Sequence, residues 1–121
     1  MDDRPEWVRL GDAILGPLLA DTSQALASFS GADYHITQVP RLALHHLAHC
    51  LQTSIDTNRD GCHGVALSLL RQAVEALTIV ELGLVGTDVA YRLLEGWDSG
   101  KLTHGNLRCA LEKSVWPKYG N

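Results

Sequence analysis

The stretch from Gly64 to Val85 limits the possible folds of this chain more than any other part of the sequence. On a helical wheel at about 100° per residue, its apolar side chains cover a wide arc, and its last two turns are apolar on nearly every side. A helix that is apolar all round is buried, so we predict a central helix here. Glu81 lies inside the apolar arc and therefore requires a partner for its charge.

Four other segments have helical periodicity, whereas strand-like alternation is confined to the short stretch 33–39. The helical segments span residues 5–31, 40–55, 88–97 and 104–115. In the first of them the pair Gly16-Pro17 predicts a kink or a break into two helices. Thr87 and Thr103 are the expected N-caps of the last two.

The sequence DTNRDG, from Asp56 to Gly61, separates the second helical segment from the central one. It matches the first half of an EF-hand calcium loop, but Leu67 stands where that loop needs a bidentate carboxylate. We interpret it as a turn that joins the two helices as an antiparallel hairpin. The predicted fold is therefore all-α, a single bundle of four to five helices built on this hairpin.

Length and composition fit one domain, residues 1–121, either complete or the N-terminal part of a longer protein. The chain is 45% hydrophobic and 20% charged, which is ordinary for a soluble globular protein. The longest apolar run is too short to span a bilayer. The N-terminus, MDDRPEW, is acidic where a signal peptide is basic. Three cysteines without framework spacing indicate reduced thiols. We expect a cytoplasmic protein with no membrane partner.

The formal net charge of −4 bears on the possible partners. A protein that binds nucleic acid through its phosphates needs a basic surface. Nucleic acid is therefore not an expected partner unless RNA is bound as a substrate. No glycine-rich phosphate loop or dinucleotide motif is present, so no cofactor of those kinds is expected.

The sequence HHLAHC is the clearest cluster of side chains that can bind a metal. Histidine and cysteine pairs four residues apart on a helix can bind zinc or another transition metal, and a second pair follows the turn. The candidate ligands are His45, His46, His49, Cys50, Cys62 and His63. Their spacing matches no common zinc module, so the alternative is a polar helix face that binds no metal. On the wheel these histidines lie away from the apolar stripe of their helix.

A family resemblance adds a second hypothesis. The segments ALSLLRQAVEAL and LLEGWDSGKLTHGNLRCALEKSVWP resemble uncharacterised bacterial all-helical proteins, which are similar to the HEPN domains of toxin and phage-defence systems. The resemblance covers mainly residues 62–119. It implies a metal-independent ribonuclease motif, R-x-x-x-x-H, whose two side chains meet at a dimer interface.

Arg41 and His46 are the one match to that motif. They depart from the family pattern because they lie on an early helix and because Leu42 stands where a polar residue is usual. The two side chains are also about 140° apart on an ideal helix. If this pair is catalytic, the protein is a ribonuclease with Arg41 and His46 as its catalytic residues.

The sequence therefore leaves two classes of function open. The first is a non-catalytic interaction or assembly module, in a bacterial defence or toxin–antitoxin system by resemblance. The second is a catalytic or metal-binding protein that uses Arg41 or the HHLAHC helix face. The apolar end of the central helix and the aromatic residues Trp97 and Trp116 predict more apolar surface than one small bundle can cover. We therefore expect a homodimer or a helical protein partner.

Overall fold

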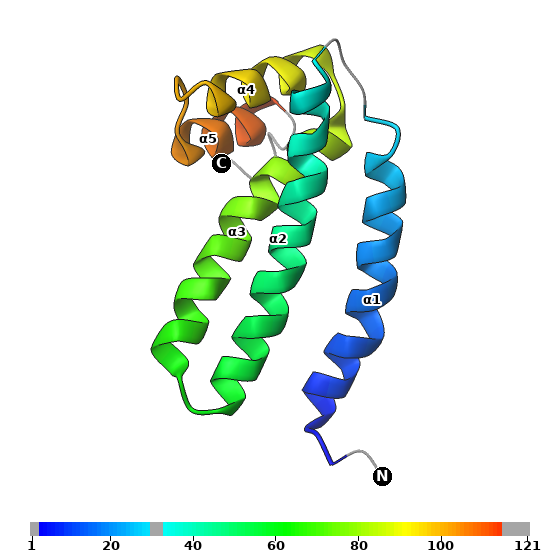
Figure 1. Cartoon of the computed structure of the whole chain (residues 1–121), viewed down its shortest axis with the longest axis vertical. Coiled ribbons are helices and arrows are strands. Elements are labelled where there is room, and N and C mark those ends of the chain that lie inside the picture. The colour runs from blue at the N-terminus through cyan, green and yellow to red at the C-terminus, as the bar shows by residue number, and fades with distance from the viewer. Residues whose placement is uncertain (1–2, 30–32, 115–121) are drawn as a thin grey trace.

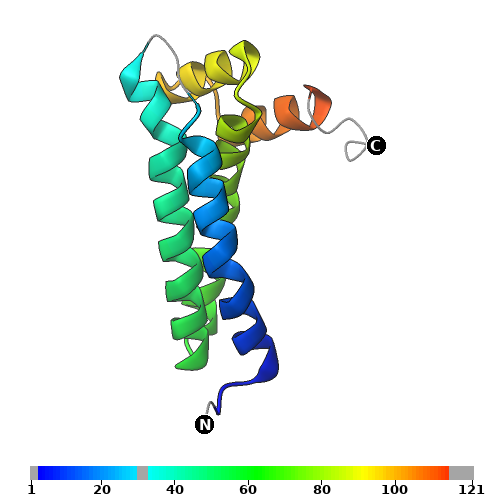
Figure 2. The ribbon, with the colours of Figure 1, turned by 90° about the vertical axis from the view of Figure 1, so that its right-hand side faces the viewer.

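The computed structural model describes residues 3–29 and 33–114 and is all-helical over them. Five helices follow one another along the chain: α1 (Glu6–Leu26), α2 (Tyr34–Arg59), α3 (His63–Val85), α4 (Asp88–Asp98) and α5 (His104–Ser114). The three long helices lie side by side, with α2 between α1 and α3 (Figure 1). The short helices α4 and α5 pack at one end of this bundle, and α5 projects away from it (Figure 2). The predicted all-α bundle is confirmed.

The helices α2 and α3 form the predicted antiparallel hairpin. The turn is shorter than the DTNRDG stretch, because α2 continues to Arg59 and reverses through Gly61, whose φ is 85°. Such a positive φ favours glycine, which has no Cβ to clash with the backbone. Ser54 donates a buried hydrogen bond of 2.9 Å to the carbonyl of Ala66, and so ties the two helices together near the turn.

The start of α2 is a correction to the sequence prediction. The helix begins at Tyr34, not at Pro40, because the Asp33 side chain caps it by accepting a 2.9 Å hydrogen bond from the His35 amide. Pro40 lies inside the helix and is buried. It packs against Gly83 of α3, where an added Cβ would lie only 2.4 Å from the Pro40 Cβ. The glycine therefore allows the close approach of α2 and α3 at this level.

At Gly16-Pro17 the sequence predicts a kink or a break into two helices, and the break is wrong, since α1 is one helix with Pro17 inside it. Both residues are exposed, so the proline ring meets no neighbouring helix. The helix therefore continues with one fewer hydrogen bond on its solvent side. The inner side of α1 reaches the core through Val8 and Leu26, which are both buried.

The core consists of two clusters of buried residues. One lies between the three long helices and includes Leu26, Leu47 and Val80. The other lies where α4 and α5 cover the end of the hairpin, and it includes Ile79 and Leu94. Ile79, Val80 and Leu82 near the end of α3 are therefore covered within the chain, whereas Leu84 is 47% exposed. Trp97 is partly buried against the same cluster, and Trp116 lies outside the described residues.

Glu81 has the partner that its position on α3 requires. The guanidinium of Arg108, on α5, lies 3.0 Å from the Glu81 carboxylate and 3.3 Å from that of Glu112. The Glu81 side chain is 19% exposed. This ion pair therefore compensates a carboxylate that α5 would otherwise bury unpaired.

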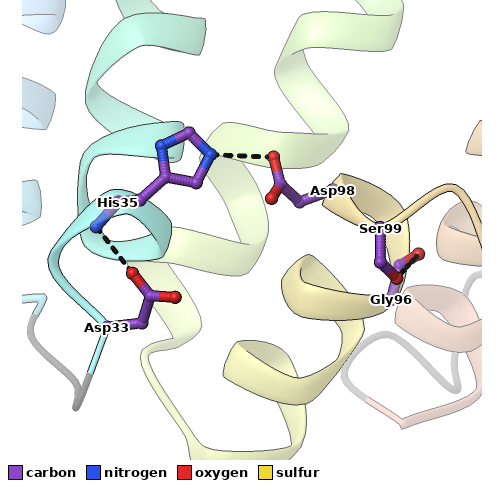
Figure 3. A network of polar contacts seen from close by, with 5 residues as sticks. All are labelled: Asp33, His35, Gly96, Asp98 and Ser99. Atoms are coloured by element: carbon purple, nitrogen blue, oxygen red, sulfur yellow. Dashed lines mark hydrogen bonds and ion pairs between the residues drawn. The ribbon is translucent and has the colours of Figure 1, made fainter.

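The caps predicted for the two short helices are present. The Thr87 hydroxyl accepts a 3.2 Å hydrogen bond from the Ala90 amide at the start of α4, and the Thr103 hydroxyl accepts one of 3.1 Å from the Asn106 amide. The C-terminal end of α4 is joined to the first turn of α2 by a 3.0 Å contact between the His35 ring and the Asp98 carboxylate (Figure 3). The α4–α5 end is thereby attached to the hairpin by polar contacts as well as by the core.

Candidate functional site

The HHLAHC sequence lies in the middle of α2, and its side chains point in different directions. His45, His46 and His49 are exposed, whereas Cys50 is buried in the core cluster between the long helices. His45 and His49 share one side of the helix, and His46 lies about 100° away from His45. The interpretation that these histidines are not core residues is confirmed. Cys50, by contrast, belongs to the core and not to the polar face.

One contact joins members of this cluster. The Cys50 Sγ lies 3.5 Å from His46 Nε2, which is the distance of a weak sulfur hydrogen bond. A catalytic cysteine needs a thiolate that its substrate can reach and a base that is held in orientation beside it. Cys50 is only 1% exposed. Among the described residues, no hydrogen bond joins His46 to a carboxylate. Cys50 therefore has the surroundings of a structural cysteine.

Cys62 and His63 lie at the hairpin turn, away from the centre of α2. His63 Nδ1 contacts the Asn58 side-chain oxygen at 2.6 Å. Cys50 lies nine residues before the end of α2 at Arg59, which is about 14 Å along the helix axis at 1.5 Å per residue. In residues 3–29 and 33–114 no three His, Cys, Asp or Glu side chains are grouped to hold a metal ion. Zinc binding by HHLAHC stays a prediction without a formed site.

Arg41 is directed toward α1 and not toward His46. Its Nη2 donates a 3.2 Å hydrogen bond to the Ala27 carbonyl, just after the last residue of α1. A cation at this position interacts favourably with the helix C-terminus. Within one chain, Arg41 and His46 therefore do not form a common site. The ribonuclease hypothesis would need a second chain to bring such side chains together.

A groove with a volume of about 610 Å³ lies beside His46, and we call it the α2–α3 groove. Its apolar floor comes from α2 and α3. Its polar rim comes from His46 and Glu75 along the hairpin, and from Trp97, Asp98 and His104 where α4 ends and α5 begins. The Trp97 and His104 rings contact each other with their centroids 5.6 Å apart. Of these rim residues, the sequence prediction included only His46 as a site residue, because the others meet only through the packing of α4 and α5.

A second surface, with exposed apolar side chains, lies on the other side of the hairpin. Seven Leu, Ile and Val side chains, between 38% and 69% exposed, form two stripes. They are Leu10, Ile14 and Leu18 on α1, and Leu67, Leu70, Val74 and Leu77 on α3. We call these seven residues the α1/α3 face. Their spacing of four on α1, and of three and four on α3, is visible in the sequence and could have identified them.

The two stripes flank the same open corner of the bundle. On α2, Ile55 lines one groove with Leu67 and Leu70, and a second groove with Val8 of α1. The stripe of α3 therefore lies on the side of the hairpin where α1 packs. The helices α1 and α3 are parallel (Figure 1), and Leu26 meets Gly83. Counting back from this contact at equal rise per residue places Leu10 level with Leu67.

No protein-family model matches this chain, and neither does any curated protein or solved structure. Over the described residues, no helix combines the length and the apolar content needed to cross a membrane. The α2–α3 groove and the α1/α3 face are the two surfaces of the described residues that bear on function.

Proposed function

We propose that this protein is a non-catalytic helical assembly module that forms a homodimer through the α1/α3 face. The observation that carries the proposal is the pair of apolar stripes at one height of the bundle. Four-helix bundles place their helices at four corners around one core. Here α1, α2 and α3 occupy three corners, and the stripes border the fourth. A helix of a second chain, placed in that corner, would cover both stripes.

To reach the standard interface size, each chain has to contribute about 800 Å² of its α1/α3 face. A two-fold axis uses the same face of both chains, so one apolar patch is sufficient.

The setting of the module is part of the same proposal. The resemblance to HEPN-like domains supports a role in a bacterial defence or toxin–antitoxin system, and three cysteines without framework spacing support a cytoplasmic location. Domains of that group also meet their partner chain through helices. A ribonuclease is the less favoured reading, because Arg41 is used to cap α1.

Sedimentation equilibrium at high micromolar concentration tests the proposal. We expect a mass of twice 13.2 kDa for the wild type. Val74→Glu places a charge at the centre of the α3 stripe and should yield the single-chain mass, as should Leu10→Glu on α1. Val65→Glu is the matched control, because Val65 is a valine of α3 with similar exposure, 55% against 61% for Val74, that lies outside the stripe. A wild-type mass of one chain, or a monomer produced equally by Val65→Glu, would refute the proposal.

A further inference from the structure

The α2–α3 groove has the size and lining of a ligand site. Its volume of about 610 Å³ lies within the usual range of about 300–1000 Å³ for small-molecule pockets. Val39, Ala43 and Ile79 form an apolar floor at the hairpin. An apolar floor with a few polar groups at the rim is the usual composition of such sites.

The charges at the rim have one sign. Glu75 and Asp98 are the charged side chains that line the groove, and no lysine or arginine of the described residues lines it. Asp98 is partly compensated by His35, at 3.0 Å. Glu75 is exposed and has no ion-pair partner among the described residues. The groove therefore favours a ligand that carries positive charge over a neutral or anionic one.

Two ring side chains add to this preference at the α4–α5 end of the groove. An indole ring attracts a cation placed over its face, and Trp97 lines the groove with His104 packed against it. His104 Nδ1 is buried and has no hydrogen-bond partner among the described residues. This nitrogen is inaccessible to a ligand, so His104 contributes to the groove through its ring, which packs against Trp97.

We infer that the α2–α3 groove binds a small organic cation, with its ammonium group near Glu75 or Trp97 and its apolar body on the floor. This inference goes beyond the proposed assembly function and does not depend on it. On α3, the residues that line the groove and those of the α1/α3 face are centred about 170° apart. A Val74→Glu monomer should therefore bind the cation as the wild type does.

The probe is benzyltrimethylammonium, which joins a permanent positive charge to a ring of suitable size. Its titration is followed through the indole N–H signal of Trp97 in the nitrogen–proton correlation spectrum, assigned with a Trp97→Phe variant. We expect a saturable shift of this signal. Benzyl alcohol and phenylacetate, which are neutral and anionic, should cause a smaller shift or none.

Charge reversal at Glu75 distinguishes binding of the probe in the groove from its non-specific attraction to an acidic protein. Glu75→Lys should weaken binding of the probe by at least about fivefold, which corresponds to about 1 kcal/mol for one exposed charge. Glu95→Lys is the matched control, because Glu95 is exposed on α4 and does not line the groove. Glu75→Gln, which preserves the size of the side chain, should give a smaller loss in the same direction.

Three results would overturn the inference. They are the absence of a shift at Trp97, an equal shift with phenylacetate, and an equal loss of affinity in Glu95→Lys and Glu75→Lys. None of them would alter the sedimentation result, so the failure of this inference and the failure of the assembly proposal can be told apart.

Discussion

Gly83 is the position where a single methyl group tests the packing of all three long helices. A Cβ added there would lie 2.4 and 2.7 Å from ring carbons of Pro40 and 2.8 Å from Leu26 Cδ2. Carbon atoms in contact are normally about 3.5–4.0 Å apart, so Gly83→Ala requires a movement of roughly 1 Å. The Pro40 ring cannot rotate away, and both neighbours are buried. The helices themselves would have to separate.

Two opposing effects determine the stability of Gly83→Ala. Alanine is favoured over glycine within a helix by about 1 kcal/mol, whereas overpacking a core costs about 1–3 kcal/mol, occasionally more. The added Cβ meets three carbon atoms, on Pro40 and on Leu26. We therefore expect overpacking to dominate, with a net loss of about 2 kcal/mol in the free energy of unfolding. For a domain of this length, the midpoint of thermal unfolding should fall by about 8 °C.

The assay is thermal and urea unfolding followed by circular dichroism, at one fixed protein concentration because dimerisation affects the midpoint. Gly11→Ala is the matched control, since a Cβ at Gly11 in α1 has nothing within 4 Å. The free energy of unfolding of Gly11→Ala should rise by up to about 1 kcal/mol through helix propensity alone. If Gly83→Ala were as stable as Gly11→Ala, the close approach of α1, α2 and α3 at this level would be wrong.

Three further predictions concern single side chains, two of them in polar contacts and one in the ribonuclease hypothesis. Arg108→Met leaves Glu81 without its ion pair, so the free energy of unfolding in urea should fall by about 1–2 kcal/mol; an unchanged value would contradict the need of Glu81 for this partner. Thr87→Ala removes the cap that bonds the Ala90 amide and should lower the free energy of unfolding by about 1 kcal/mol in the same assay. Thr87→Ser keeps the hydroxyl and should lose little stability; equal stability of the two variants would contradict the cap. In a gel assay of RNA cleavage, His46→Ala and the wild type should behave alike, because the module is proposed to be non-catalytic; activity lost only in the variant would favour the ribonuclease hypothesis.

Much of the candidate site was not predictable because its residues are distant in sequence. The α2–α3 groove joins His46, Glu75 and Asp98, from three different helices, and their meeting depends on how α4 and α5 pack across the hairpin. The HHLAHC cluster had the opposite outcome. Its residues are close in sequence, but Cys50 turns into the core while the histidines face solvent. Closeness in sequence therefore does not bring the HHLAHC side chains together as a set of metal ligands.

The sequence alone determined the features of this protein that depend on local interactions. The bounds of α3, the caps of α4 and α5 and the hairpin could be predicted, because periodicity and capping involve residues only a few positions apart. Tertiary packing decided the rest. It placed Pro40 inside α2 opposite Gly83, and it gave Glu81 its partner on α5. It also decided which part of the apolar helix α3 remains exposed, since α4 and α5 cover only one end of it and leave the other beside α1.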